Sequence, residues 1–333
     1  MSIERTDIKY YKSLTYNDTV SNGGRRSNTL LLSGSSNQMF PVITSAERAA
    51  GSLKYRKIFV QIESVQNLPL IDPKIYIENP TPAQDMVFFF PGTKSDIQSG
   101  ITGTERKYGC GVLETSVVAG GTTLVVQTES STVDIFQDGD LVRISNKSNI
   151  DDTTAQVTEE VVLVTGTPLR QGSIITIPIA PLTFDYTSGI SRVSSVYQPG
   201  TLAPSIENLL VTSSSGIYNS SDHPISLYSK ATIDQTWTVR FLSASQVSVT
   251  GDSVGALGTF SATSDIAPIN PQTSSPYFRI PVTGLSGSFT LNDLISFKSN
   301  SQSVGLWFQR IVPAGTASFT GNKFVVVVEG ESE

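Results

Sequence analysis

The sequence predicts an all-β protein built from antiparallel β-sandwich or barrel modules, with very little helix. Short runs of β-branched and aromatic residues recur along the 333 residues at spacings of about 8–14 residues, with Gly, Pro, Asn and Asp between them. Hydrophobic residues make up 38% of the chain, which is enough for real cores, whereas charged residues make up only 16%. Helix signals are scarce by comparison. This pattern is typical of sandwiches and barrels.

The predicted strands are the runs in which β-branched and aromatic side chains dominate. In chain order these runs are Tyr55–Ile62, Lys74–Ile77, Met86–Phe90, Thr123–Gln127, Leu141–Ile144, Glu160–Val164, Ser173–Ile177, Trp237–Leu242, Gln246–Thr250, Leu306–Val312 and Phe324–Val328. The best helix signal is Thr44–Gly51, where Thr44 can cap the first turn, Glu47 stands three residues on, and Gly51 ends the helix. The stretch Ala262–Tyr277 contains three prolines, which cannot donate to a strand ladder, so it predicts an extended loop.

Charge is distributed unevenly and suggests where one module is inserted into another. Residues 1–110 carry 13 Lys and Arg against 10 Asp and Glu, residues 111–190 carry 3 against 10, and residues 191–333 carry 7 against 9. The middle segment is also rich in Val and Thr. We therefore predict that residues 1–111 and 188–333 form the main β-sandwich module or modules. Residues 112–187 would form a small acidic β domain that is inserted into it and folds separately.

The chain is poor in the side chains that most enzymes use for proton transfer and nucleophilic attack. It contains one histidine, His223, and one cysteine, Cys110. His223 follows Asp222, but adjacent Asp and His side chains rarely reach each other as they do in a catalytic triad. Cys110 lies between two glycines, which favours a small residue in a bend over a reactive thiol. We therefore expect no enzyme activity, no catalytic residue and no internal disulfide.

Acidic residues suggest a metal site more than catalysis. Asp138, Asp140, Asp151 and Asp152 are hard oxygen ligands of the kind that Ca²⁺ prefers. However, Asp138-Gly139 before a strand is a common hairpin signal, and no EF-hand spacing follows it. A glycosidase would need two well-placed carboxylates, and nothing in the sequence singles out a pair. We expect no metal and no cofactor.

Composition also bears on partners and on the site of synthesis. The basic residues that could face nucleic acid or form a basic rim against a partner subunit are Arg25, Arg26, Lys54, Arg56, Lys57, Arg106 and Lys107. With an isoelectric point of about 5.0, we do not expect direct binding of nucleic acid. No apolar run approaches the length of a membrane span, and the first residues contain no apolar signal segment, so we expect synthesis in the cytoplasm and no membrane partner.

Large side chains on the predicted strands are the candidates for core or interface positions. We assign Trp237 and Trp307 to packing in the core or at an interface. We expect Phe308 and Arg310 to lie with Trp307 on one strand of the main core or its interface. These residues and the pair Arg25 and Arg26 are the interface or core candidates of this chain.

Several strings, in order along the chain, carry a resemblance to a known family. In the first part these are Tyr10–Ser13, Ser21–Gly24, Met39–Arg48 and Tyr55–Val60, in which an NGG turn precedes a short FP…ER segment and a YRK strand. In the second part they are Phe136–Asn146, Gln235–Phe241, Tyr277–Pro281 and Trp307–Gly315. In these strings the chain resembles a family of virion structural proteins of tailed bacteriophages, contractile-tailed phages that are Mu-like or related. The resemblance covers nearly the whole chain.

The resemblance implies a non-enzymatic component of a phage particle, made in the host cytoplasm and located in the virion. We expect it in the neck or collar between head and tail, where copies would close into a homo-oligomeric ring through polar β-rich interfaces and contact neighbouring virion proteins. Positions elsewhere in the tail, as a receptor- or glycan-binding module of the tail or baseplate, or as a capsid decoration protein, are the alternatives. A glycan hydrolase is a further, enzymatic alternative.

Overall fold

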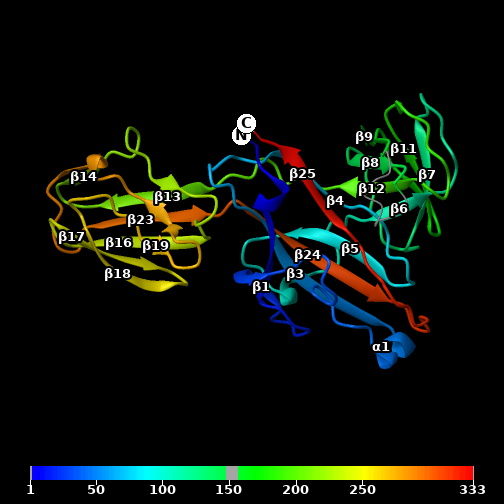
Figure 1. Cartoon of the computed structure of the whole chain (residues 1–333), viewed down its shortest axis with the longest axis horizontal. Helices are drawn as coiled ribbons and strands as arrows, with labels where there is room; N and C mark the ends of the chain where they lie inside the picture. The colour runs from blue at the N-terminus through cyan, green and yellow to red at the C-terminus, as the bar shows by residue number, and fades with distance from the viewer. Residues whose placement is uncertain (1, 148–156, 333) are drawn as a thin grey trace.

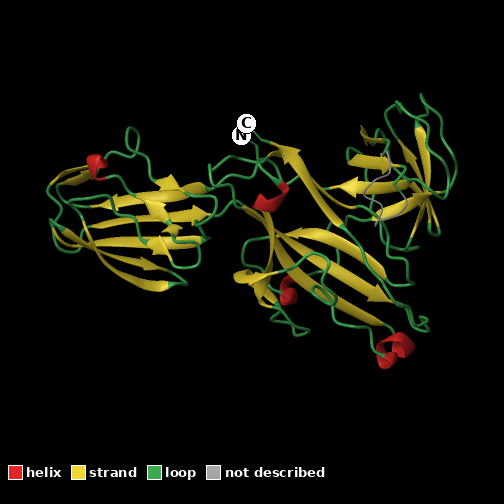
Figure 2. Cartoon of the chain, viewed as in Figure 1, coloured by secondary structure: helices red, strands yellow, loops and turns green. Residues whose placement is uncertain are grey.

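The protein consists of three β lobes in a row, and Figure 1 shows a middle lobe with one further lobe on each side. Its computed structural model describes residues 2–147 and 157–332. We call residues 2–109, 197–204 and 301–332 the central lobe, residues 110–196 the acidic lobe and residues 205–300 the distal lobe. Each lobe has its own cluster of buried hydrophobic side chains. Strands dominate all three lobes (Figure 2), so the all-β prediction is confirmed.

The central lobe is a five-stranded antiparallel sheet in the order β2-β1-β3-β24-β5, with a separate pair of strands, β4 and β25. Its strands are β1 (Ile8–Thr15), β2 (Gly23–Leu30), β3 (Ser52–Ile62), β4 (Ile71–Ile77), β5 (Met86–Gly92), β24 (Ser303–Val312) and β25 (Val326–Glu331). Strand β24 lies between β3 and β5 and has a partner on both sides from Gly305 to Ile311. This position explains why nearly every residue of β24 is buried.

Helical structure is confined to short segments. Helix α1 (Ser45–Ala50) is the one α-helix among the described residues, and the 3-10 turns are Arg5–Asp7, Gln98–Gly100 and Val282–Gly284. The predicted capping box is confirmed, because the Glu47 amide donates to Thr44 Oγ1 (3.2 Å) and the Thr44 amide donates to Glu47 Oε2 (2.7 Å). Gly51 follows with a positive φ of 80° and ends the helix.

The acidic lobe is a seven-stranded antiparallel sheet in the order β10-β11-β7-β6-β12-β8-β9. Its strands are β6 (Cys110–Leu113), β7 (Thr123–Thr128), β8 (Leu141–Ser145), β9 (Glu159–Leu163), β10 (Leu169–Gln171), β11 (Ile174–Pro178) and β12 (Arg192–Val196). Val164 forms a bridge to Ile179, and the Ala180 amide donates to the carbonyl of Leu163 (2.9 Å). These contacts join the edge strand β9 to the end of β11, so the sheet closes on itself like a small barrel.

The distal lobe contains a second five-stranded antiparallel sheet, in the order β13-β23-β16-β17-β18. The strands of this sheet are β13 (Ser205–Thr212), β16 (Gln235–Ser243), β17 (Gln246–Gly251), β18 (Gly255–Ser261) and β23 (Leu294–Asn300). Three short pairs complete the lobe: β14 (Gly216–Tyr218) with β22 (Leu285–Gly287), β15 (Ser226–Leu227) with β21 (Phe278–Arg279), and β19 (Ile269–Asn270) with β20 (Ser275–Pro276). Trp237 and Phe278 meet in its core with ring centroids 5.1 Å apart.

The limits of the lobes can be set beside the predicted ones. Residues 205–300 build a sheet and a core of their own, so residues 1–111 and 188–333 contribute to two modules, a number that the prediction left open. The sheet of the acidic lobe begins at Cys110 and ends at Val196, so it includes β6 and β12, which lie at or beyond the ends of the predicted insertion 112–187. The acidic lobe is also docked rather than free, since Phe88 of the central lobe belongs to its hydrophobic core.

The proline-rich stretch is mostly loop, as predicted, but it is not wholly so. Strands β19 and β20 pair within it, and Pro276 itself lies in β20. A proline is tolerated in this two-residue edge strand because alternate residues of a strand point their backbone N–H away from the partner strand.

On one face of the central sheet, the buried ammonium group of Lys57 lies beside the ring of Trp307. Lys57 of β3 is fully buried and its Nζ lies 2.5 Å from Asp96 Oδ1, while the Trp307 indole donates to Asp96 Oδ2 (2.7 Å). Lys57 Nζ also donates to the carbonyls of Gly24 (2.9 Å) and Asp96 (3.0 Å). Burial lowers the pKa of Lys57, and Asp96 opposes that shift. All three ammonium hydrogens have an acceptor, so the charge can remain inside.

The NGG turn fits this site through its first glycine. Gly23 has a φ of +109°, and a Cβ at this position would lie 2.7 Å from two carbons of the Trp307 ring. Gly24 also has a positive φ, +81°, but a Cβ there would meet no atom within 4 Å.

We expect Gly23→Ala to lower the free energy of unfolding by about 2–4 kcal/mol, since backbone strain and a clash with the indole add. The matched control, Gly24→Ala, adds strain alone and should cost about 1 kcal/mol. Chemical denaturation with Trp fluorescence measures both. Equal losses for the two variants would contradict the packing role of Gly23.

Candidate functional site

Three of the predicted residues lie on β24 but face different surroundings. Trp307 is fully buried on the Lys57 side of the sheet. Phe308 points to the opposite face, where it stacks on Phe89 with ring centroids 5.6 Å apart. Arg310 follows two residues later on the same face as Phe308. Trp307 and Phe308 are therefore core residues, whereas Arg310 lines a hollow in the surface.

The hollow has a volume of about 910 Å³ and lies between β24 and two long connections, 31–43 and 316–326. Apolar side chains dominate its inner wall, among them Phe40, Ile58, Val87 and Phe324. The charged residues that line it are Arg48, Asp85, Arg310 and Lys323, so cations outnumber the single carboxylate. The hollow is therefore concave and mixed in character, with an apolar wall and a few charged groups.

Arg310 is the unusual group in this hollow. Its side chain is only 7% exposed, and its Nε and Nη2 have no hydrogen-bond partner among the described protein atoms. The guanidinium lies 4.7 Å from the centre of the Phe40 ring. Burial lowers the pKa of Arg310, and the nearby Asp85 opposes this shift. Asp85 itself accepts a hydrogen bond from Asn322 (2.7 Å). Both nitrogens are themselves buried, so this guanidinium lies in a largely apolar setting with part of its hydrogen-bonding capacity unused.

The rim of the hollow is apolar and exposed. Leu32, Val42 and Phe319 line it and are 57%, 66% and 51% exposed, respectively. Exposed apolar residues that cluster at a concave site mark a surface for a partner more often than an isolated exposed leucine does. The hollow is therefore the candidate binding surface of the chain.

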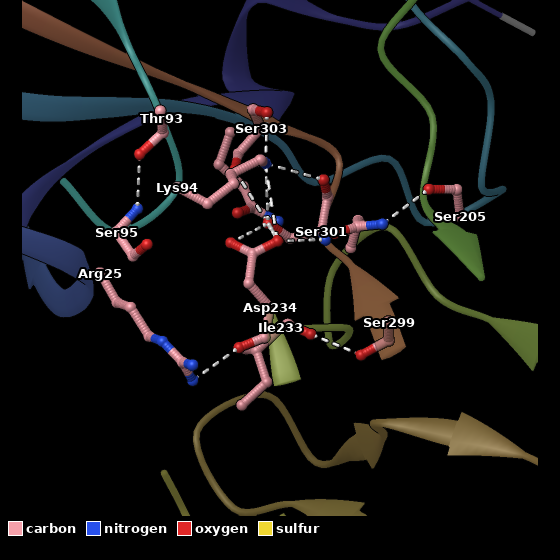
Figure 3. Close-up of polar contacts among 12 residues, drawn as sticks. Arg25, Thr93, Lys94, Ser95, Ser205, Ile233, Asp234, Ser299, Ser301 and Ser303 are labelled. Carbon is pink, nitrogen blue, oxygen red and sulfur yellow. Dashed lines mark hydrogen bonds and ion pairs between the residues drawn. The ribbon is translucent and has the colours of Figure 1, made fainter. Parts of the chain in front are cut away.

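A second polar site fixes the distal lobe to the central lobe. Figure 3 shows Lys94 and Asp234 facing each other beside Ser301 and Ser303, where the chain returns from the distal lobe into β24. Lys94 Nζ donates to the carbonyl of Ser303 (2.5 Å) and lies 3.6 Å from Asp234 Oδ1, which accepts the amide of Ser301 (2.8 Å). Burial lowers the pKa of Lys94, and Asp234 opposes that shift.

Further contacts across this boundary make the attachment rigid. Arg25 forms an ion pair with Asp252 (2.7 Å) and also donates to the carbonyl of Asp234 (3.3 Å; Figure 3). Gln61 Nε2 donates to the carbonyl of Ser229 (3.0 Å) from the interior of β3. The predicted candidate Arg25 is therefore an interface residue between two lobes of the same chain.

We expect Asp234→Ala to loosen the distal lobe, because Lys94 would lose its carboxylate partner and the Ser301 amide its acceptor. The free energy of unfolding should fall by about 1–3 kcal/mol. Hydrogen exchange should accelerate at residues 202–205 and 300–303. Asp222→Ala, at an exposed loop position of the same lobe, is the control and should change neither quantity. Unchanged exchange in Asp234→Ala would show that the other contacts suffice.

A third polar site joins the acidic lobe to the central lobe. Glu129, which follows β7, accepts the Thr81 amide (2.9 Å) and hydroxyl (3.0 Å) and, more weakly, the Val87 amide (3.4 Å). Burial raises the pKa of Glu129 to about 7, the bonds from Thr81 oppose the shift, and the nearby Asp85 adds to it. Arg143 and Lys147 of the acidic lobe also pair with Glu78 at this boundary.

The raised pKa of Glu129 gives a prediction for stability against pH. Its unfolded-state pKa is near 4.5, so the associated stability is complete below that pH, declines as pH rises toward 7, and stays low above it. Glu129→Gln removes the ionisation. At pH 8 the variant should be more stable than the wild type, by up to about 3 kcal/mol, and the difference should shrink as pH falls and vanish below about pH 4. Melting temperatures across this range test it, with exposed Glu114→Gln as the control. A pH-independent difference would contradict the assignment.

The remaining predicted residues have structural environments. Trp237 is fully buried in the distal lobe and its indole donates to Ser299 Oγ (2.8 Å). Arg26 lies over the Tyr11 ring at 4.4 Å and donates to the carbonyl of Ser27 (3.2 Å). His223 lies in a loop, with its Nδ1 3.0 Å from Thr283 Oγ1 rather than beside a carboxylate. Burial raises the pKa of the Cys110 thiol to about 12, which makes it a poor nucleophile.

The basic residues considered for contact with nucleic acid are largely paired with carboxylates of the same chain. Lys54 pairs with Glu47 (2.6 Å) and Asp18 (3.1 Å), and Arg56 pairs with the same Asp18 (2.5 Å). Lys57 is buried against Asp96. These pairings leave little positive charge free for phosphate contacts.

The acidic residues considered as calcium ligands do not converge where they are described. Asp140 accepts the Gln137 amide (2.6 Å) and forms an ion pair with Arg106. Asp151 and Asp152 lie outside the described residues. Within residues 2–147 and 157–332, no three His, Cys, Asp or Glu side chains gather as a metal-binding group. None of the helices in that part of the chain has the length and apolar character needed to cross a membrane.

Comparisons with known proteins do not assign the chain to a family. No protein-family model matches the chain, and no curated protein sequence matches it.

The groups that hold the lobes together were not predicted. Lys94, Asp234 and Glu129 carry no local sequence signal, because each acquires its partner from a distant part of the chain.

Proposed function

We propose that this protein is a non-enzymatic structural component of a bacteriophage particle, which assembles into a ring at the neck, the collar or elsewhere in the tail. The observation that carries the proposal is the hollow around Arg310, whose exposed apolar rim lies over a wall of buried apolar side chains. Such a surface suits permanent contact with another folded subunit, since its apolar rim is stabilised by burial against a complementary surface.

Two further features support an assembly role. The three lobes are fixed to one another by buried polar contacts, so the chain presents its surfaces in a defined arrangement. The basic side chains near β3 are paired with carboxylates, which favours protein partners over nucleic acid. The resemblance of the ordered sequence strings to virion structural proteins of tailed phages directs the proposal toward the particle.

The first test is the absolute mass of the purified protein, measured by light scattering across a concentration series. We expect a discrete six- or twelve-fold species, because rings built from one repeated heterologous contact close at a fixed copy number. A stable trimer would contradict the ring and favour a fibre or receptor-binding role. Binding of host glycan by an isolated monomer would favour the alternative of a glycan-binding module.

A further inference from the structure

We propose that copies of this chain are joined by exchange of an arm, residues 317–331, so that strand β25 of one copy pairs with β4 of the next copy. The inference rests on the proposed function and deepens it, because it names the contact that would repeat around the ring. We call residues 317–331 the β25 arm and residues 313–316 its hinge. The structure itself selects the occupant, since the surface beside β4 already fits this arm within one chain.

The β25 arm is a separate piece of the central lobe. Strand β24 ends at Val312, and residues 313–325 contain no strand before β25 begins at Val326. Among the described strands β25 pairs with β4 alone, whereas β24 has partners on both sides. The arm can therefore leave its place while the five-stranded sheet stays intact.

The apolar side chains of the arm require a β4 strand, whichever copy supplies it. Phe324, Val326 and Val328 pack on the hydrophobic core of the central lobe. In the ladder, Val326 and Val328 lie opposite Ile77 and Ile75 of β4. Exposure of these side chains to water is unfavourable, so a released arm would bind the same surface on another copy.

The polar contacts of the arm would be kept in the exchange as well. The Ala317 amide donates to Gln84 Oε1 (2.9 Å), and Asn322 Nδ2 donates to Asp85 Oδ1 (2.7 Å). Both acceptors belong to the segment that connects β4 to β5. An arm that arrives at β4 from another copy would therefore find the same acceptors beside it.

The hinge is a tight turn that can open. The Thr316 amide donates to the carbonyl of Pro313 (3.3 Å), and Gly315 has a φ of +83°, as the third position of a type II turn requires. The Gly315 amide also donates to the carbonyl of Arg48 (2.8 Å). These bonds favour the closed chain. An extended hinge would instead carry the arm away from β24 and toward a neighbour.

A new contact beside the hinge favours the exchanged form. Since the arm makes the same contacts in both forms, only surfaces that meet for the first time can stabilise the assembly. Leu32, Val42 and Phe319 are exposed apolar residues on the rim of the hollow, and Phe319 lies just beyond the hinge. Exchange brings a second copy to this rim and buries it.

A disulfide trap in the full chain tests which copy supplies β25. Lys74→Cys and Glu329→Cys place two thiols directly opposite each other in the ladder of β4 and β25, within the reach of a disulfide. In the assembled species, isolated by size and then oxidised, the bond should join different chains. Denaturing gels without reductant should therefore show covalent multimers. Cys110 should not compete, since its buried thiol has a pKa raised to about 12.

A second cysteine pair is the matched control for the trap. Thr236→Cys and Lys298→Cys lie opposite each other in the ladder of β16 and β23, which no exchange of the arm would affect. This pair should form its bond within one chain in every species. An assembled species in which the first pair also yields only covalent monomers would overturn the exchange.

Gly315→Ala gives an independent test, because it acts on the hinge and leaves the arm unchanged. Alanine is strained at a positive φ but not in an extended hinge, so the closed form should be disfavoured and the association constant should rise by about tenfold. Light scattering and sedimentation across a concentration series measure this change.

Gly321→Ala is the matched control for the hinge variant. Gly321 also has a positive φ, 75°, and a Cβ at either glycine would meet no atom within 4 Å. Because Gly321 lies in the arm and keeps its conformation in the exchange, Gly321→Ala should leave association unchanged. An association constant that does not rise in Gly315→Ala, or that rises equally in Gly321→Ala, would overturn the proposal.

The exchange and the proposed function fail in different ways. A ring in which the first cysteine pair is bonded within single chains overturns the exchange and leaves the ring intact. Covalent dimers without larger species support the exchange and contradict the ring. A chain that stays monomeric at every concentration, Gly315→Ala included, overturns the exchange. Labelling of purified phage particles by antibodies to the chain then decides the structural role independently.

Discussion

The buried ion pair between Lys57 and Asp96 is the constraint on which the central lobe depends. A fully buried ammonium is tolerated only when each of its hydrogens has an acceptor, and here Asp96 and the carbonyl of Gly24 supply them. Asp96 also accepts the indole hydrogen of Trp307. Strand β2, which contains Gly24, and the loop that contains Asp96 are thereby tied to β3 and β24. Since β24 also carries Arg310 and begins at the junction with the distal lobe, the same constraint positions both sites.

The sequence revealed the parts of the fold that are encoded locally. Every predicted apolar run overlaps a strand, and the capping box of α1 is present, because periodicity and capping depend on neighbouring residues. Strands β1, β2 and β13 are among those that were missed, since their polar and half-exposed residues give no clear alternation. The limits of the distal lobe were also missed, because its aromatic composition resembles that of the central lobe.

The candidate site was predictable only in part. Placing Trp307, Phe308 and Arg310 on one strand followed from the pattern of residues 306–312, and they lie on β24. Trp307 and Phe308 are core residues, whereas Arg310 lines a hollow. This difference depends on the course of segments 31–43 and 316–326, which line the same hollow. These segments carry no periodic signal. The pairing of Lys94 with Asp234 likewise depends on the tertiary arrangement, which no local pattern encodes.

The two outer lobes leave and re-enter the central lobe at neighbouring points. Cys110 and Ser194 are paired across β6 and β12, and Ser205 and Asn300 are paired across β13 and β23. In each case the strand by which the chain enters the outer lobe is paired with the strand by which it leaves. The outer lobe is therefore joined to the central lobe through two adjacent strands, as a hairpin would be. Gene rearrangements can therefore lengthen, shorten or exchange an outer lobe while the central sheet keeps its connectivity.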